Sequence, residues 1–429
     1  MVQQIFRTLK YRNYRLFFFG QTISLIGTQV QYVAISWLAY RLTGSAAMLG
    51  LVNFVSRSPT FFFAPLAGLW ADRADRHKAM IWIQSLEMAQ AAFLAFLALT
   101  GHVRVWHLFT LGFFLGVING FEVPIRQSFI YETVEKKEDL GNALALNTTM
   151  IQLSFLLGPV LAGTIVAWVG EGWCFLINAV SFIAVLGGLI AMRLPRKTPA
   201  SSLAKHGQAF RDGFRHAFGT IPLRYLLLLM ALISLTGHPY QVLLPVFAKQ
   251  VLKGGPDTLG WLGSAAGLGA LAGTLYLASR KTLRGLEKRA VFAIILFGSG
   301  LILFSFSRNL VLSMALMVPV GMGSAMQITA CQTLIQAMVD DEMRGRVMSF
   351  YTMAFMGTVP FGGMLYGLLS DRITAPTTVL VGGLFCVAAG TFFLMRLSHY
   401  KFHAIPILIR KGINVEGCTA FKEVEILEP

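Results

Sequence analysis

The sequence predicts an all-α polytopic membrane protein with twelve transmembrane helices in two six-helix bundles. Its composition, its succession of apolar runs and an internal repeat lead to this prediction. Hydrophobic residues make up 55% of the chain and charged residues only 13%, whereas a soluble domain has roughly 25% charged residues. Such a chain must bury most of its surface in lipid. We therefore read the net charge of +16 as a bias of basic residues toward cytoplasmic loops, not as a sign of nucleic-acid binding.

The apolar runs are long enough to cross a bilayer as helices. With the amino terminus inside, most of the 36 Lys and Arg residues fall on the cytoplasmic side. The first run is too long for a signal-peptide core and has no small-residue cleavage site behind it, so we expect it to remain as the first span. We expect a multi-pass membrane protein with both termini cytoplasmic. The predicted spans are approximately 15–40, 46–70, 79–100, 106–128, 142–168, 173–193, 222–248, 257–279, 290–307, 310–336, 346–369 and 376–397.

The repeat appears when the second half is laid on the first with an offset near 205 residues. This offset aligns Gln127 with Gln332 and, after a one-residue gap, Gly158 with Gly362. Parallel repeats of this kind indicate a protein built from two matching six-span halves. We expect an amino-terminal bundle (1–193), a polar cytoplasmic linker (194–221), a carboxyl-terminal bundle (222–397) and a mobile cytoplasmic tail (398–429).

A dense charge cluster follows the second span and contains the pattern G-x-x-x-D-R-x-x-R at Gly68, Asp72, Arg73 and Arg76. On general grounds this is a solvated hairpin with a positive-inside bias. The pattern also resembles the signature loop between spans two and three of the major facilitator superfamily of transporters. That resemblance implies a conformational gate, in which Asp72 lies near the amino end of the eleventh span and Arg73 and Arg76 bind acids such as Glu132 or Glu135.

A second match to G-x-x-x-D-R occurs at Gly367–Arg372. The predicted topology puts it on the opposite side of the membrane. We interpret it as a chance match.

The fifth span contains Gly158, Pro159 and Gly163, which resemble the Gly-Pro signature of antiporters in this superfamily. Small residues let helices approach closely, and proline lets a helix bend. Ordinary small-residue packing is the alternative. The wider sequence resembles the branch of bacterial exporters that includes the enterobactin exporter and macrolide efflux proteins, over about residues 5–397. This resemblance implies a protein of the bacterial inner (cytoplasmic) membrane. The segments that carry this likeness are Gly20–Thr28, Leu42–Ser45, Pro124–Gln127 and Asp139–Asn147.

Polar residues share one face of the first span, where Thr28 and Gln31 follow Gln21 and Ser24 at helical spacing. The seventh span, its repeat partner, carries His238 and Gln241, and glycine and proline beside the histidine could loosen the helix there. We predict that Thr28, Gln31, His238 and Gln241, together with Asn119, line a central cavity. Hydrogen bonding between packed helices is the alternative.

Few ionisable residues lie within the spans, and each should be paired or face water. They are Arg57, Glu87, Glu122 and Arg126. Glu122 and Arg126 are four residues apart on one helical face with Asn119, and their repeat partners are neutral. Three interpretations remain open: a permanent ion pair, a proton-carrying carboxylate helped by Arg57 or Arg126, and direct contact with a cationic substrate.

We therefore predict a secondary transporter that works by alternating access and exports an amphipathic, drug- or siderophore-like small molecule in exchange for protons. Its expected partners are this substrate, protons and membrane lipids, and we expect it to function as a monomer. We expect no enzymatic activity, cofactor or metal, because the sequence has no phosphate-binding loop, H-E-x-x-H motif or paired cysteines. The alternatives are a lysophospholipid or other lipid-type transporter without proton coupling, and a non-transporting membrane sensor or scaffold.

Overall fold

The computed structural model describes residues 7–71, 75–193, 206–280 and 283–411. The predicted spans of the first half correspond to single helices. These are α2 (Arg12–Thr43), α3 (Ala46–Ala71), α4 (Arg76–Leu99), α5 (Val105–Thr133), α6 (Leu140–Val169) and α7 (Glu171–Ala191). Two short turns, η1 (Arg7–Lys10) and η2 (Lys137–Asp139), precede α2 and α6.

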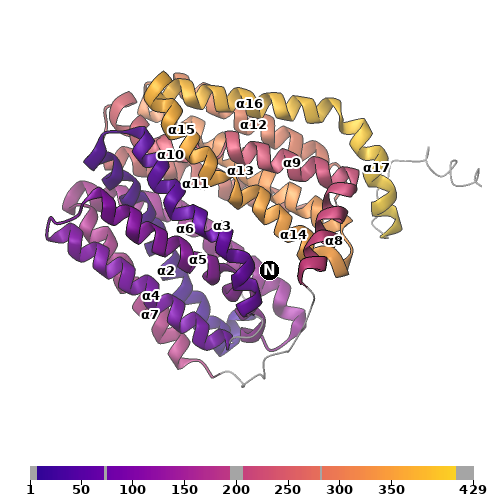
Figure 1. The fold of residues 1–429 in the computed structure, drawn as a ribbon, viewed down its shortest axis with the longest axis horizontal. Helices are drawn as coiled ribbons and strands as arrows, with labels where there is room; N and C mark the ends of the chain where they lie inside the picture. The colour runs from indigo at the N-terminus through magenta and orange to yellow at the C-terminus, as the bar shows by residue number, and fades with distance from the viewer. Residues whose placement is uncertain (1–6, 72–74, 194–205, 281–282, 412–429) are drawn as a thin grey trace, which may run out of the picture.

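The second half repeats this plan with two interrupted spans. The seventh span consists of α9 (Ile221–Thr236), α10 (Tyr240–Val246) and η3 (Phe247–Val251), and the eleventh of α14 (Asp341–Thr352), η4 (Met353–Gly357) and α15 (Val359–Ile373). The uninterrupted spans are α11 (Pro256–Ala278), α12 (Leu286–Phe306), α13 (Leu310–Met338) and α16 (Ala375–Met395). In Figure 1 the indigo-to-magenta helices of the first half lie together on one side and the orange-to-yellow helices on the other.

Ten of the described segments are long and apolar enough to cross a membrane. The helices α2, with 32 residues, and α3, with 26, coincide with the two remaining predicted spans. At 1.5 Å per residue both exceed the roughly 30 Å of a hydrocarbon core. The predicted fold class, twelve membrane-spanning helices and no sheet, is confirmed for the described residues.

The helix break in the seventh span lies where the sequence predicts it. Gly237 ends α9, and Pro239, which has no amide hydrogen to donate, precedes α10. The turn between them holds His238 inside the bundle. The sequence did not predict the equivalent interruption in the eleventh span, which is a short π-helical turn.

Two regions outside the spans are more ordered than expected. In the predicted linker, residues 206–219 form helix α8 (His206–Gly219), whose Phe214 and Phe218 contact Phe350 of α14. In the predicted tail, α17 (Leu397–Arg410) packs on α9 and α13 and buries Tyr400 and Leu408. The expectation of a mobile tail is wrong for this helix, because the apolar residues of 397–410 recur at helical spacing and cover the bundle. Residues 412–429 lie outside the described part.

The two halves contact each other mainly through two helix pairs, α3 with α15 and α6 with α11. Both pairs meet where small residues let the backbones approach. A Cβ atom on Gly50 would lie 2.6 Å from the carbonyl oxygen of Gly363, and one on Gly163 would lie 2.9 Å from the Cα of Gly260. Larger residues at these positions would push the helices apart.

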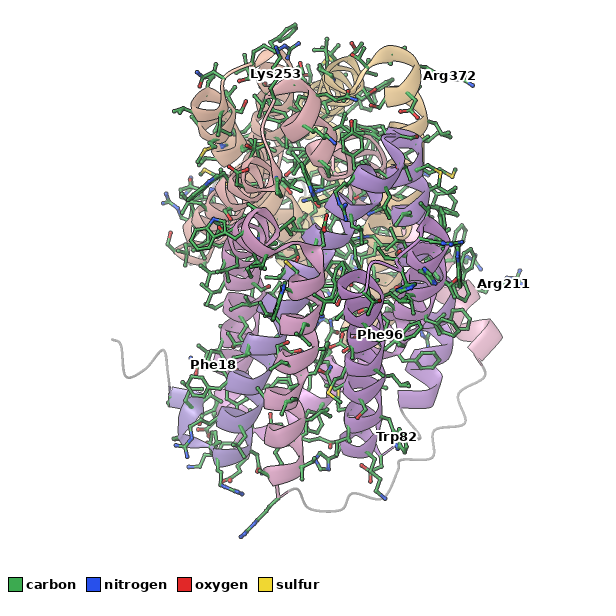
Figure 2. The ribbon with its side chains drawn as sticks, turned by 90° about the vertical axis from the view of Figure 1, so that its left-hand side faces the viewer. Phe18, Trp82, Phe96, Arg211, Lys253 and Arg372 are labelled. Carbon is green, nitrogen blue, oxygen red and sulfur yellow. The ribbon has the colours of Figure 1, made fainter. Side chains whose placement is uncertain are left out.

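The contacts of α3 with α15 lie toward one end of the bundle, where α3 begins and α15 finishes. We call this the first end, and the opposite end, where α3 finishes and α4 begins, the second end. Figure 2 shows Lys253 and Arg372 at the first end and Trp82 near the second.

Candidate functional site

A buried ion pair lies within the first half. Arg126 Nε is 2.6 Å from Glu122 Oε1, and the two side chains are 11% and 9% exposed. Arg126 Nε donates no hydrogen bond in this arrangement, so the contact is one of charge. The two residues are four apart on α5, with the acid first, as the sequence predicts.

Further polar groups surround this pair near the middle of the spans. Glu87 of α4 is buried and interacts electrostatically with both Glu122 and Arg126. Tyr32 of α2 accepts a hydrogen bond from Asn119 Nδ2 at 3.2 Å, and the Arg57 guanidinium of α3 lies 5.5 Å from the centre of the Tyr32 ring. Four helices of the first half therefore contribute to one cluster, the charged cluster of Tyr32, Arg57, Glu87, Asn119, Glu122 and Arg126.

Arg57 differs from the rest of the charged cluster because its side chain is exposed. It lies eleven residues into α3, which at 1.5 Å per residue is roughly 16 Å from the helix end. A guanidinium at that depth is costly in hydrocarbon. Arg57 is therefore expected to face water, and this favours a hydrated space beside the charged cluster.

The second half has no equivalent cluster at the repeat positions. Ser324 Oγ is 3.5 Å from His238 Nδ1, and the histidine ring packs against Phe297 and Phe355. His238 Nε2 is buried without a hydrogen-bond partner among the described residues. The second half thus offers an apolar and aromatic wall with one neutral polar edge.

Gln31 faces its own half and not a cavity. Its Nε2 donates to Gln90 Oε1 at 3.0 Å, and its Oε1 accepts from Asn178 Nδ2 at 2.9 Å. With both ends of the amide bonded and the side chain 2% exposed, Gln31 matches the packing alternative in this conformation. Thr28 is half-buried on α2, one turn before Tyr32, and Gln241 is exposed on α10.

Tyr32 and Asn178 were not among the site residues predicted from the sequence. Tyr32 lies four residues after Thr28 and extends the polar face of the first span, so helical spacing was the available signal. Asn178 is one polar residue in an apolar run of α7, and no local pattern marks it.

The antiporter-like motif lies at the contact between the halves. The carbonyl oxygen of Pro159 approaches Gly260, and a Cβ atom on Gly163 would lie 2.6 Å from the carbonyl oxygen of Pro256. On its other side, Gly158 lies against Gln29 of α2. The motif therefore supplies close packing between α6 and its two neighbours.

The gate loop is described only in part. Gly68 belongs to the last turns of α3, and Asp72 and Arg73 lie outside the described residues. Arg76 Nη1 is 3.0 Å from Glu132 Oε1 of α5, which is the ion pair expected from the resemblance. Asp75 accepts a hydrogen bond from the amide of Lys78 and so caps α4.

The Gly367–Arg372 segment, interpreted above as a chance match, makes a specific contact between the halves. Asp371 Oδ1 accepts from the amide of Ala46 at 2.9 Å, and Oδ2 accepts from the amide of Ala47 at 3.1 Å and from Ser45 Oγ at 2.8 Å. A carboxylate is favourable at the positive end of a helix. The first end of the bundle is therefore held by an acid from one half at the amino end of a helix from the other.

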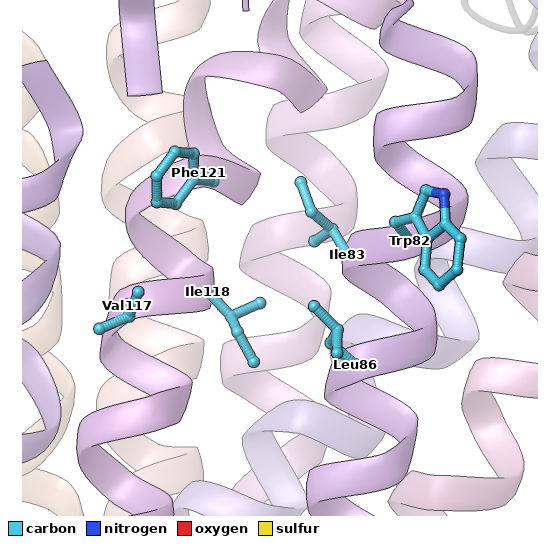
Figure 3. Close-up of a pocket in the computed structure, with 6 residues that line it drawn as sticks. All are labelled: Trp82, Ile83, Leu86, Val117, Ile118 and Phe121. Carbon is cyan, nitrogen blue, oxygen red and sulfur yellow. The ribbon is translucent and has the colours of Figure 1, made fainter. Parts of the chain in front are cut away.

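A groove with a volume of about 370 Å³ lies between α4 and α5 (Figure 3). No charged side chain lines it, so it offers apolar contact. Although Leu86 and Phe121 directly precede Glu87 and Glu122, they line this groove on the outside of the charged cluster. The lining residues are Trp82, Ile83, Leu86, Val117, Ile118 and Phe121.

Known proteins similar to this chain are transporters. Residues 4–407 match the family described as transmembrane secretion effector. The staphyloferrin A transporter of Staphylococcus aureus is 24% identical, over 90% of this chain and 97% of its own length. Macrolide efflux protein A of Streptococcus pyogenes is 25% identical, over 88% of this chain and 96% of its own length. The multidrug efflux pump Tap of Mycobacterium tuberculosis is also 25% identical, over 87% of this chain and 91% of its own length.

Solved structures show the same fold. A bacterial homologue of the iron transporter ferroportin, in an inward-facing state, superposes with a TM-score of 0.69 at 18% identity and covers 90% of this chain and 98% of its own. A bacterial homologue of the human lysosomal transporter Spinster, in an inward-facing and occupied conformation, superposes with a TM-score of 0.67 at 14% identity. It covers 93% of this chain and 98% of its own. The predicted resemblance is confirmed, and transporters of this kind are not enzymes. The chain belongs to the transmembrane secretion effector family of the major facilitator superfamily and is a multi-pass membrane transporter.

Proposed function

We propose that this transporter exports an amphipathic, drug- or siderophore-like small molecule and that proton binding at Glu122 drives the export. The observation that carries the proposal is the buried Glu122–Arg126 pair, with Glu87 close enough to interact with both. The three buried charged groups, two carboxylates and one guanidinium, carry one negative charge in excess at a low-dielectric site, whereas the fourth charge of the cluster, Arg57, is exposed. One added proton would neutralise this excess.

Alternating access supplies the change in environment that such a carrier needs. The halves are held together at the first end by Asp371 and by the glycine contacts of α3 with α15. We place the first end on the external side, from the predicted positive-inside orientation. In this arrangement the conformation opens to the cytoplasm, where substrate enters, and Asp72, Arg73 and Arg76 gate the second end.

The charged cluster is also suited to substrate contact. We assign Thr28, Arg57 and Asn119 of the first half to the cavity wall, with His238 and Gln241 on the facing half. Exposed Arg57 gives an anionic group of a substrate a partner, and the aromatic side chains around His238 suit its apolar part. The relatives named for a siderophore, macrolides and multiple drugs support this substrate class.

The direct test is Glu122→Gln, which keeps the size and hydrogen bonding of the side chain and deletes its titratable group. The protein is reconstituted in vesicles with a panel of drug- and siderophore-like substrates, and a pH step is imposed. A coupled antiporter should lose uphill transport and keep substrate exchange. Uphill transport that survives in the variant would exclude Glu122 as the proton carrier.

The matched control is Glu171→Gln. Glu171 is another buried acid of the first half in an ion pair with an arginine, since its Oε1 lies 2.7 Å from Arg41 Nε. It lies at a helix end, away from the charged cluster. The Glu171→Gln variant should keep uphill transport driven by the pH step. If only Glu122→Gln loses this transport, the cause is the position of Glu122 and not the loss of an ion pair in general.

A further inference from the structure

A second groove, unrelated to the charged cluster, lies in the second half between α11, α12 and α13. Its volume is about 520 Å³. Unlike the groove between α4 and α5, it combines apolar side chains with two cationic ones. The lining residues are Tyr276, Lys288, Arg289, Phe292, Met322 and Met326.

One of the two cations has an unsatisfied group. Arg289 Nη1 is buried and has no hydrogen-bond partner among the described residues. Buried polar groups are normally paired, and a buried guanidinium nitrogen without an acceptor is costly. The geometry therefore points to an acceptor that binds here from outside the chain.

The surrounding charge favours an anion. The acid next to these cations in sequence, Glu287, is already paired with Lys401 of α17 at 3.1 Å. Arg280 adds a further positive charge, since its guanidinium lies 4.9 Å from the centre of the Tyr276 ring. No acidic residue lines the groove in the described part of the chain.

The position of the groove matches that of a lipid. Lys288 and Arg289 lie in the first turn of α12 and Tyr276 in the last turn of α11, so the cations lie where spans leave the membrane and where phosphate headgroups are found. Phe292, one turn deeper, is 57% exposed on a membrane-spanning helix. Met322 and Met326 continue the apolar lining toward the middle of α13, where flexible thioether side chains suit an acyl chain.

We propose that this groove is a binding site for an anionic phospholipid. The phosphate accepts hydrogen bonds from Arg289 and Lys288, and one acyl chain lies along Phe292, Met322 and Met326. A soluble phosphate would use the same cations but would leave the apolar part of the groove unfilled. The site lies outside the proposed transport pathway, so its test does not depend on the proposed function.

The test is native mass spectrometry of the full-length protein titrated with phosphatidylglycerol or with phosphatidylcholine of the same chains. The wild-type protein should retain phosphatidylglycerol preferentially. Arg289→Gln should weaken its binding about fivefold, the effect of roughly one surface cation, and Lys288→Gln should do the same. Arg289→Lys should retain most of the preference, which separates loss of charge from misfolding.

Two further measurements complete the test. The first is a control for the specificity of the site, and the second distinguishes a lipid from soluble phosphate as the source of the anion. Lys253→Gln removes one exposed cation at the first end (Figure 2) and should leave binding unchanged. Phe292→Ala should weaken phosphatidylglycerol binding while inorganic phosphate fails to compete at millimolar concentration. Equal binding of both lipids, an unaffected Arg289→Gln variant or full competition by inorganic phosphate would each overturn the proposal.

Discussion

The carboxylate of Asp371, in the last turns of α15, lies 2.9 Å from the backbone amide of Ala46, the first residue of α3. One half of the transporter thereby caps a helix of the other. The resemblance to the gate motif predicts a second contact of this kind, between Asp72, which follows Ala71 in the sequence, and the amino end of the eleventh span. The second and eleventh spans would then share an acid-to-helix contact at each end of the bundle, because the eleventh span begins with α14 and finishes with α15. The two contacts would hold opposite conformations.

Asp371→Asn should weaken the closed first end, because the neutral amide loses the attraction of a carboxylate for the helix terminus, worth about 1 kcal/mol at an exposed site. We expect a lower melting temperature in detergent and faster labelling of a cysteine placed at Ser45. Asp257→Asn is the control, since this acid lies at the same end in the first turn of its own helix. Equal effects of the two substitutions would show that the contact between the halves does not matter.

Gly163→Ala should separate α6 from α11 at the first end. The added Cβ would lie 2.6 Å from the carbonyl oxygen of Pro256 and 2.9 Å from the Cα of Gly260, and backbone atoms cannot move aside as a side chain can. We expect a several-fold lower transport rate at equal expression. Gly187→Ala is the matched control in the same half, because nothing lies within 4 Å of the added atom. Wild-type rates in Gly163→Ala would show that the antiporter-like motif tolerates a wider helix spacing.

Removing Arg126 alone should destabilise the protein more than removing Arg126 and Glu122 together. Arg126→Met leaves two buried carboxylates without their cation, and breaking a buried pair in this way costs about 3–5 kcal/mol. The double variant Glu122→Gln with Arg126→Met should recover part of that loss, as measured by thermal melting. If the double variant is as unstable as Arg126→Met, Glu87 and not Glu122 is the acid that depends on the arginine.

Cysteine labelling should separate cavity residues from packing residues. Cysteines at Thr28 and Gln241 should react with a small water-soluble thiol reagent, and substrate should protect them. A cysteine at Gln31 should stay inert, because Gln90 and Asn178 enclose this position. Reaction at Gln31 with inert cysteines at the other two positions would reverse the assignment of the cavity wall.

Asp139→Asn should destabilise the second end of the first half in a pH-dependent way. A hydrogen bond from Tyr11, 2.6 Å long, together with Lys10 and Arg7, lowers the pKa of Asp139 below its ordinary value. A lowered folded-state pKa stabilises the protein above the unfolded pKa, and this stabilisation is lost as the pH falls through the folded value. The difference in melting temperature between wild type and variant should stay constant from neutral pH down to about pH 5 and shrink below about pH 4. A difference that is unchanged at pH 3 would show that the carboxylate charge contributes nothing.

The sequence by itself determined the class of the protein and most of its elements. Apolar runs of fixed minimum length are imposed by the thickness of a bilayer, so all twelve spans could be predicted before any contact was known. The helix break beside His238 was also predictable, because proline and glycine act through the local backbone. The Glu122–Arg126 pair followed from four-residue spacing on one helix, which is likewise a local property.

Only the tertiary structure decided what each polar face meets. Gln31 and Thr28 share a helical face in the sequence, yet Gln31 is enclosed by two neighbouring helices, and periodicity does not report which side of a helix faces a neighbour. Asp371 belongs to a copy of the gate motif that the predicted topology puts on the opposite side of the membrane from the first copy. Its contact between the halves depends on Ala46, which is more than 300 residues away in the sequence. The unpaired nitrogen of Arg289 was also invisible in the sequence, because whether a cation has an acceptor depends on every helix packed around it.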